Sequence, residues 1–335
     1  MVTSETQFFG VPRSEAPRKE APDKPGAGEL ESAMSNFGKI PVIDIAALRS
    51  DDPAKRMLCA KRIGRVCREV GFFYIVDHGV DRALVAQTFA AAAAFFALPT
   101  EVKMRMKDKS RRYCGYLALG GEMTNPSAGP DRREAFGISL DSPATASRVR
   151  AGKPLRGQNQ WLAAPPGFTS VLTAYYKSLC ELGTLISRGF ALALELPEDF
   201  FARRLKRPTA NLRIIHYPTN VQIATQAAAP NLGCGAHTDN GYLTILAQDN
   251  EGGLQVRNPA GRWIDALPIE GSFVCNIGDT MARLTNNMMR PTPHRVVHRS
   301  SNSRYSVSFI FHPDLGPGRT RREPVMPKNS VRSLI

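Results

Sequence analysis

The stretch GAHTDNGYLTILAQDN, residues 235–250, has a polar pair just before an apolar run. His237 and Asp239 stand one residue apart, between glycines. If the stretch is a strand, side chains at positions i and i+2 leave from the same face. We therefore expect the imidazole and the carboxylate to point at one spot.

Further short strand patterns lie on both sides of this stretch. From Asn211 onward, apolar runs alternate with turn residues: NLRIIHY, GYLTILAQ, GGLQV, RWIDA, SFVCNIG, HRVVH and RYSVSFIFH. Many short strands at close spacing indicate a sandwich or barrel, with jelly rolls among the possibilities. The second half of the chain is therefore predicted to be β.

The first half has a different pattern. Apolar residues recur at helical spacing from about Pro53 to Val70, from Leu84 to Phe96 and from Phe168 to Leu194, whereas KIPVIDI (39–45) and GFFYIVDHGV (71–80) are typical of strands. Residues 1–37 are rich in Pro, Ala, Gly and mixed charge, which predicts a disordered tail. We expect an N-terminal α/β region over 38–205, a β core over 206–313 and a short C-terminal tail over 314–335.

Composition narrows the class of protein. The 335 residues carry a net charge of +14, but Lys and Arg are spread along the chain with no nucleic-acid-binding motif, so no nucleic-acid partner is expected. No apolar run approaches the roughly 20 residues that cross a bilayer, and no signal peptide is visible, so we expect no membrane association. The six cysteines lack CxxC spacing, which favours a reducing cytoplasm. No obligate protein partner is evident.

A third residue, His294 in TPHRVVH, completes a candidate metal site with His237 and Asp239. Two histidines and one carboxylate hold a non-haem Fe(II) and leave three coordination positions open, which oxygen chemistry requires. Zinc would accept the same ligands. His298 is a poor ligand candidate, because i and i+4 on a strand lie roughly 13 Å apart. His78, before a glycine in a turn, is predicted to be structural.

The order of these motifs resembles one family. HxD, then 54 residues, then His, then nine residues, then RxS is similar to the iron and 2-oxoglutarate-dependent dioxygenases of the isopenicillin N synthase-like superfamily. IPVIDI, GFFYIVDHGV, LRIIHYP, GGLQV, GDTMARLTNN and TPHRVVH resemble family segments in the same order, over roughly residues 39–313. The resemblance implies a mainly β fold with flanking helices: a double-stranded β-helix (jelly roll, cupin-like) core with a helical N-terminal region.

The resemblance also implies site residues. His237, Asp239 and His294 match the iron ligands of the family. Its cosubstrate-binding residues are matched by Arg304, Ser306 and Tyr217. The strand pattern agrees, because Arg304 and Ser306 share a face and a guanidinium binds a carboxylate through two parallel hydrogen bonds. A 2-oxoacid clamp also argues against a zinc hydrolase.

Three residues are candidates for the substrate pocket. Ile310 shares the parity of Arg304 and Ser306, and Arg213 lies beneath Tyr217 on the same face of its strand. Tyr116 falls in YCGYLALGGE (113–122), which resembles the segment that closes over the substrate in relatives. A departure from the family is Ile215, which stands where plant members commonly have Asn.

The implied reaction consumes 2-oxoglutarate and O2, releases succinate and CO2, and oxidises a C–H bond of a small-molecule substrate. Hydroxylation is the expected outcome, although the same residues would serve desaturation or ring closure. Two alternatives stay open. A non-haem iron oxidase or cyclase would not require 2-oxoglutarate, and a cupin-type binding protein would not be a catalyst.

Overall fold

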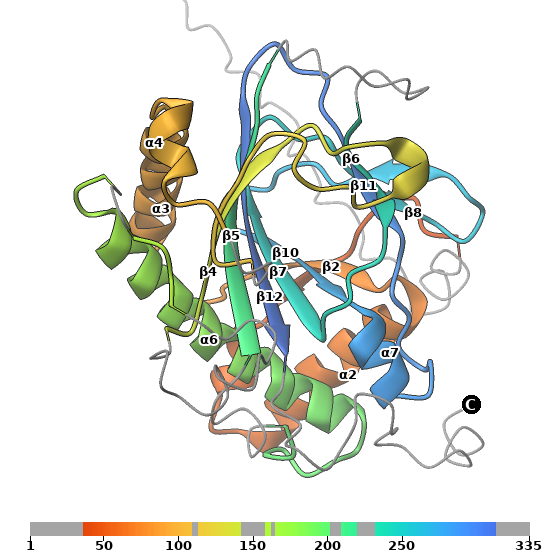
Figure 1. Cartoon of the computed structure of the whole chain (residues 1–335). Helices are drawn as coiled ribbons and strands as arrows, with labels where there is room; N and C mark the ends of the chain where they lie inside the picture. Colours follow the sequence, from red (N-terminus) through yellow and green to blue (C-terminus); the bar gives the residue numbers. More distant parts are fainter. Residues whose placement is uncertain are drawn as a thin grey trace, which may run out of the picture.

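The computed structural model describes residues 36–108, 113–141, 158–161, 165–201, 209–219 and 232–312. Two β-sheets face each other, and helices cover the outer side of the larger sheet, which is the predicted jelly-roll arrangement (Figure 1). The predicted tails fall outside the described residues, except at residues 36 and 37. Phe37 is 3% exposed and its carbonyl accepts a hydrogen bond from Asn258 Nδ2 at 3.0 Å, so packing begins slightly before the predicted boundary at residue 38.

The larger sheet has the strand order β1-β2-β10-β7-β12-β5-β4-β3 among the described residues. Its strands are β1 (Val42–Asp44), β2 (Phe72–Val76), β3 (Gly115–Leu117), β4 (Glu134–Ser139), β5 (Thr209–Tyr217), β7 (Leu243–Gln248), β10 (Phe273–Ile277) and β12 (Arg304–His312). β1 and β2 pair in parallel, and the other pairings are antiparallel. The N-terminal half therefore forms both edges of this sheet, including β3 and β4, which the sequence patterns did not predict.

The smaller sheet lies opposite and has the order β6-β11-β8-β9. Its strands are β6 (Leu232–His237), β8 (Leu254–Arg257), β9 (Trp263–Asp265) and β11 (His294–Val297). Side chains from both sheets line a cavity between them, including Tyr217 of β5, Ser306 of β12 and Val296 of β11.

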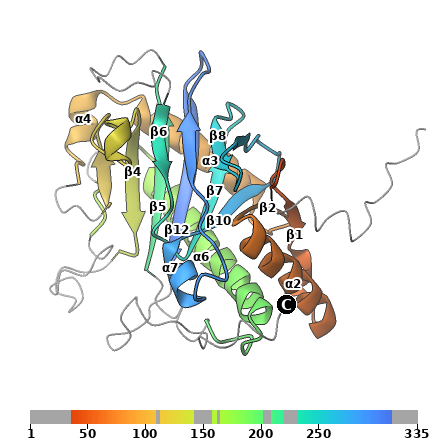
Figure 2. The same cartoon turned by 90° about the vertical axis from the view of Figure 1, so that its right-hand side faces the viewer.

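The long helices form where the apolar periodicity predicts them. The helices are α2 (Pro53–Glu69), α3 (Arg82–Phe96), α4 (Thr100–Met104), α6 (Phe168–Ala193) and α7 (Asp279–Leu284), with 3-10 turns η1 (Ala46–Arg49) and η2 (Pro126–Ala128). The Asp52 side chain caps α2 by accepting from Ala54 N at 2.8 Å, and Pro53 fits the first turn. α6 lies along the outer face of the larger sheet beside α2 (Figure 2). No helix among the described residues combines the length and apolarity needed to cross a membrane.

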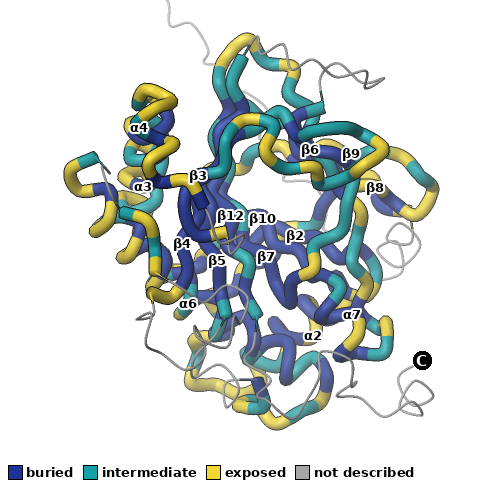
Figure 3. Tube along the Cα trace, viewed as in Figure 1, coloured by how far each residue is buried: buried dark blue, intermediate teal, exposed yellow. Residues whose placement is uncertain are grey.

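The central strands are buried on both faces, because α6 and α3 cover one face and the smaller sheet covers the other (Figure 3). Alternate residues of β5 therefore meet different surroundings. Ile214 and His216 face the helices, whereas Arg213, Ile215 and Tyr217 line the cavity. This alternation brings polar groups into an otherwise apolar interior.

Candidate active site

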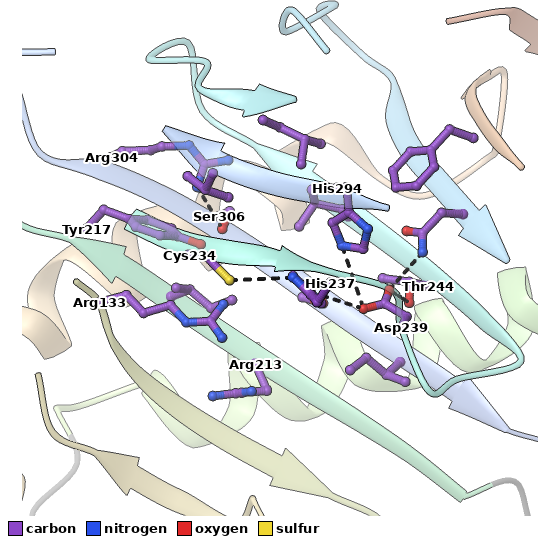
Figure 4. Close-up of a pocket in the computed structure, with 18 residues that line it drawn as sticks. Arg133, Arg213, Tyr217, Cys234, His237, Asp239, Thr244, His294, Arg304 and Ser306 are labelled. Carbon is purple, nitrogen blue, oxygen red and sulfur yellow. Dashed lines mark hydrogen bonds and ion pairs between the residues drawn. The ribbon is translucent and has the colours of Figure 1, made fainter. Parts of the chain in front are cut away.

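The three predicted metal ligands come together at one end of the smaller sheet. His237 ends β6, His294 begins β11, and the two residues are cross-strand partners. Nε2 of each histidine lies 3.7 Å from Oδ1 of Asp239 (Figure 4). Among the described residues, these three form the group of His, Cys, Asp or Glu side chains that could hold a metal ion.

Asp239 does not lie on the strand that carries His237, so the expectation of one shared strand is wrong. β6 ends at His237, and Asp239 stands in the segment that leads to β7. The carbonyls of Asp239 and Gly241 accept hydrogen bonds from Asp279 N and Thr280 N at the start of α7, at 2.8 and 3.1 Å. The backbone here bonds to a helix rather than to a neighbouring strand, yet the carboxylate still meets the imidazoles.

The Asp239 carboxylate is held by two donors that the sequence analysis did not identify. Thr244 Oγ1 of β7 and Asn276 Nδ2 of β10 both donate to Oδ2, at 2.5 and 2.8 Å. Burial raises the pKa of Asp239, but His294, His237 and these donors outweigh it and lower the pKa overall. The carboxylate is therefore ionised, with Oδ2 bonded to the protein and Oδ1 facing the histidines.

The histidines present their Nε2 atoms to the same point. His237 Nδ1 lies 2.8 Å from the Gly235 carbonyl, and His294 Nδ1 lies 3.3 Å from the Thr292 carbonyl. A carbonyl accepts only, so each Nδ1 carries a proton and each Nε2 is the atom available to a metal. Burial opposes the charged form of His237, but Cys234, Asp239 and the Gly235 carbonyl outweigh it and raise the pKa of His237 to about 9, so this imidazole loses a proton when it binds a metal. Burial lowers the pKa of His294 to about 4, which keeps this imidazole neutral.

This donor set fits a divalent metal ion. The 3.7 Å between Asp239 Oδ1 and each Nε2 is less than two metal–ligand bonds of about 2 Å, so one ion between them reaches all three residues after small adjustments. Two imidazoles and one carboxylate would hold such an ion and leave further coordination positions for other ligands.

The predicted clamp residues line the same cavity. Arg304 and Ser306 of β12 are 1% and 2% exposed, and Tyr217 of β5 is the cross-strand partner of Arg304. Arg304 Nε donates to the Gly252 carbonyl, Nη1 donates to Ser306 Oγ at 3.3 Å, and the guanidinium carbon lies 4.7 Å from the Tyr217 ring centre. Within the described residues, no carboxylate forms an ion pair with this buried cation. A buried charge without a counter-ion is costly, so Arg304 marks a place for an anion.

Of the three predicted pocket residues, Ile310 and Arg213 line the cavity and Tyr116 does not. Tyr116 pairs with Phe136 across β3 and β4, and so faces the helices. Its hydroxyl donates to Glu134 Oε2 at 2.5 Å, in a buried cluster with Lys103 and His216. The assignment of Tyr116 to the substrate pocket is therefore corrected.

The cavity also contains residues that the sequence analysis did not single out, notably Arg133, Cys234 and Ser308. Ser308 has the parity of Arg304 and Ser306, so the alternation of β12 was a sufficient signal. Arg133 lies just before β4, a strand that no sequence pattern predicted.

The two histidines predicted not to bind metal lie elsewhere: His78 stacks on Phe273 at 4.2 Å, and His298 lies near Tyr217.

Comparison with known proteins connects this geometry to a family. The family described as "non-haem dioxygenase in morphine synthesis N-terminal" matches residues 40–164, and the "2OG-Fe(II) oxygenase superfamily" matches residues 208–313. A homoarginine-6-hydroxylase of Oryza sativa is 38% identical over 288 residues, covering 83% of this chain and 86% of the relative.

Two solved structures show similar folds with bound ligands. A full-length Neurospora crassa protein in complex with alpha-KG and thymine has a TM-score of 0.73 and 28% identity, covering 84% of this chain and 88% of that one. JOX2 in complex with 2OG, Fe and JA has a TM-score of 0.66 and 27% identity, covering 91% and 90%.

Proposed function

This chain belongs to the 2OG-Fe(II) oxygenase superfamily, and on that basis we propose roles for the metal-binding and clamp residues of the cavity between its two sheets. The protein is an Fe(II)- and 2-oxoglutarate-dependent oxygenase. His237, Asp239 and His294 are the iron ligands in this proposal. The observation that carries it is the presence, in one cavity, of this ligand set and of a buried arginine that lacks a counter-ion among the described residues.

Arg304 holds the carboxylate of 2-oxoglutarate that is remote from the metal. Its contacts with Gly252 and Ser306 fix the plane of the guanidinium, and the Tyr217 ring supports one face. A planar guanidinium forms two parallel hydrogen bonds with a carboxylate, which selects a dicarboxylate of the right length. Ser306 adds a neutral hydroxyl contact in the same row.

Thr244 and Asn276 keep the Asp239 carboxylate oriented for the metal. Apolar side chains of the cavity, among them Leu246, Leu254 and Val296, exclude water from the reacting groups. When bound, the iron and its cosubstrates supply an oxidant that removes hydrogen from a C–H bond, with release of succinate and CO2. The chain's own residues bind, orient and shield the reactants.

The primary substrate in this proposal is a small molecule that becomes hydroxylated. The support is the hydroxylase name of the Oryza sativa relative and the thymine bound in the Neurospora crassa structure. All six site residues lie within the proposed catalytic core, residues 206–313. A cytoplasmic location is also proposed, since all six cysteines are free.

Succinate formation tests the proposal directly. Protein loaded with Fe(II) and 2-oxoglutarate without oxygen should release succinate once oxygen is admitted, and the release should rise when a substrate is present. His294→Ala should abolish it, because one metal ligand is lost. Substrate turnover that needs no 2-oxoacid would favour the oxidase alternative. Binding without any turnover would favour a non-catalytic cupin, and activity with zinc and no oxygen would exclude an oxygenase.

A further inference from the structure

The floor of the cavity carries a second arginine–serine pair, separate from the proposed 2-oxoglutarate clamp. β5 and β12 lie side by side, and their cavity-facing residues form rows: Arg304 with Tyr217, Ser306 with Ile215, and Ser308 with Arg213. Arg213 therefore stands four residues along β5 from Tyr217, about 13 Å at the usual rise of a strand. The two arginines mark different positions along one cavity floor.

Arg213 is buried and only partly satisfied. The residue is 8% exposed, and its Nη2 donates to Glu122 Oε2 at 2.7 Å, while Tyr113 covers the guanidinium at 5.2 Å from its ring centre. Its Nε is buried without a hydrogen-bond partner among the described residues. An unpaired donor on a buried cation is costly, so this arginine has the capacity to bind a further acceptor.

Glu122 is shared between two arginines. The same oxygen, Oε2, also accepts from Arg133 Nη2 at 3.2 Å, and Arg133 Nε is likewise buried without a partner in the described part of the chain. Asp131 pairs with Arg133 at 2.9 Å. The two arginines and two carboxylates balance in charge, so what is left over in this group within the described residues is the unpaired Nε donor of each arginine.

Ser308 supplies a second group at the same place. It is directly opposite Arg213 in the strand register, lines the cavity, and its hydroxyl has no hydrogen bond to a described residue. A guanidinium donates only, and a hydroxyl donates as well as accepts. An acceptor with negative charge, such as a carboxylate, satisfies both groups. Arg304 and Ser306 follow one another on β12, whereas Arg213 and Ser308 face each other across β5 and β12.

We infer that Arg213 and Ser308 bind a carboxylate of the primary substrate, so that the substrate is a small organic acid. This inference rests on the proposed function, because it places that acid in the same cavity as the iron and 2-oxoglutarate. The row spacing separates the two anions along the floor. A substrate carboxylate fixed on Arg213 then determines which of its carbon atoms faces the metal.

The probes for the test are alkanoic acids, arylacetic acids and amino acids, each paired with its own amide. Each is titrated by calorimetry, without oxygen, into protein loaded with Fe(II) and 2-oxoglutarate, and succinate release is then measured with oxygen. At least one acid should bind the wild type ten-fold or more tightly than its amide and should stimulate succinate release. If no acid binds more tightly than its amide, the inference is wrong.

Variants separate a direct contact from an indirect one. Arg213→Gln should weaken binding of that acid roughly ten- to a hundred-fold, and Ser308→Ala a few-fold, while the affinity for 2-oxoglutarate stays at the wild-type value. Glu122→Gln loosens the segment that carries residue 122 but keeps the Arg213 charge, so acid binding should be retained or strengthened. An equal loss in Glu122→Gln and Arg213→Gln would show that Arg213 acts only through that segment and would overturn the inference.

The affinity for 2-oxoglutarate, measured in the same samples, distinguishes the two levels of the argument. A wild type that does not bind 2-oxoglutarate contradicts the proposed function. Normal 2-oxoglutarate binding with no preference for acids contradicts only the assignment of Arg213 and Ser308.

Discussion

At the scale of single residues, the proposed metal site depends on groups that do not touch the metal. Asp239 is the ligand without a strand to fix it, and Thr244 and Asn276 bond its Oδ2. Since both donors belong to the larger sheet, the rigid sheet rather than the loop sets the direction of Oδ1. Partners of this kind typically change metal affinity roughly 10- to 100-fold when they are removed.

Thr244→Val and Asn276→Leu should each weaken Fe(II) binding by roughly ten- to a hundred-fold, or about 1.4 to 2.7 kcal/mol. Both substitutions keep much of the side-chain volume and remove one donor. An anaerobic titration against a competing chelator measures the change. The control is Thr285→Val, another buried threonine, whose hydroxyl bonds, among the described residues, within α7 and its C-terminal turn. Unchanged Fe(II) affinity in both variants would contradict the orienting role.

Arg304→Lys should raise the dissociation constant for 2-oxoglutarate roughly ten- to a hundred-fold while leaving Fe(II) binding nearly intact. The charge stays, but the paired hydrogen bonds to the carboxylate and the contact with Gly252 are lost. Ser306→Ala removes one neutral hydrogen bond, so its effect should be milder. Anaerobic 2-oxoglutarate titrations of the Fe(II)-loaded proteins measure both. An unchanged 2-oxoglutarate requirement in Arg304→Lys would refute the clamp assignment.

At the scale of elements, a buried charged cluster joins α4 and three strands on the face of the sheet opposite the cavity. Glu134 of β4 accepts from Lys103 Nζ at 2.8 Å and from the Tyr116 hydroxyl, and its Oε1 lies 2.8 Å from His216 Nδ1. Burial opposes ionisation, but hydrogen bonds from His216, Lys103 and Tyr116 outweigh it and lower the pKa of Glu134. The cluster fixes β4 against β5, which is the strand that carries Arg213.

Glu134→Gln should destabilise the protein by about 3–5 kcal/mol at neutral pH, because it leaves the buried Lys103 without its counter-ion. The sign of the pH dependence follows from the lowered pKa. The contribution of Glu134 is fully present above the pKa of an unfolded glutamate, about 4.3, and is lost as the pH falls through the lower folded value. Denaturant unfolding at a series of pH values measures the difference between the two proteins.

The matched control is Glu181→Gln, an exposed glutamate on α6, which should change stability by less than about 0.5 kcal/mol. A difference between wild type and Glu134→Gln that stays constant from neutral pH to well below the unfolded pKa would contradict an ionised, paired Glu134.

Strand alternation explains what could be predicted of the site from the sequence. On β12 and β5 every second residue faces the cavity, as the shared parity of Arg304, Ser306 and Ile310 and the shared face of Arg213 and Tyr217 predict. The assignment of Tyr116 to the cavity was wrong because its strand parity was not known. β3 was not predicted as a strand, and a shift of one residue moves a side chain to the opposite face.

The other errors come from contacts between distant segments. Asp239 leaves the strand because backbone groups of α7, about forty residues later, bond its loop. Likewise, no local pattern indicates that Arg133 and Arg213 both donate hydrogen bonds to Glu122. Such contacts depend on the tertiary arrangement and not on the periodicity of one segment.

At the scale of the whole molecule, the candidate site lies between the two sheets and takes groups from both. His237 and His294 belong to the smaller sheet, whereas Arg304 and the donors that hold Asp239 belong to the larger one. A metal bound by the first group and a cosubstrate held by the second therefore connect the sheets across the cavity. Ligand binding should stabilise the fold as a whole, and not only one loop.

Thermal unfolding without oxygen tests this connection. Fe(II) and 2-oxoglutarate together, each at about 100 times its dissociation constant, should stabilise the native state by at least about 2.7 kcal/mol, which corresponds to a rise in Tm on the order of 5 °C. 2-Oxoglutarate alone should give a smaller rise, because only its remote carboxylate is held. Asp239→Ala should lose the metal-dependent part, and Arg304→Lys should lose mainly the part that 2-oxoglutarate adds. If 2-oxoglutarate raises Tm equally with and without metal, or equally in Asp239→Ala, the cosubstrate does not join the two sheets through this site.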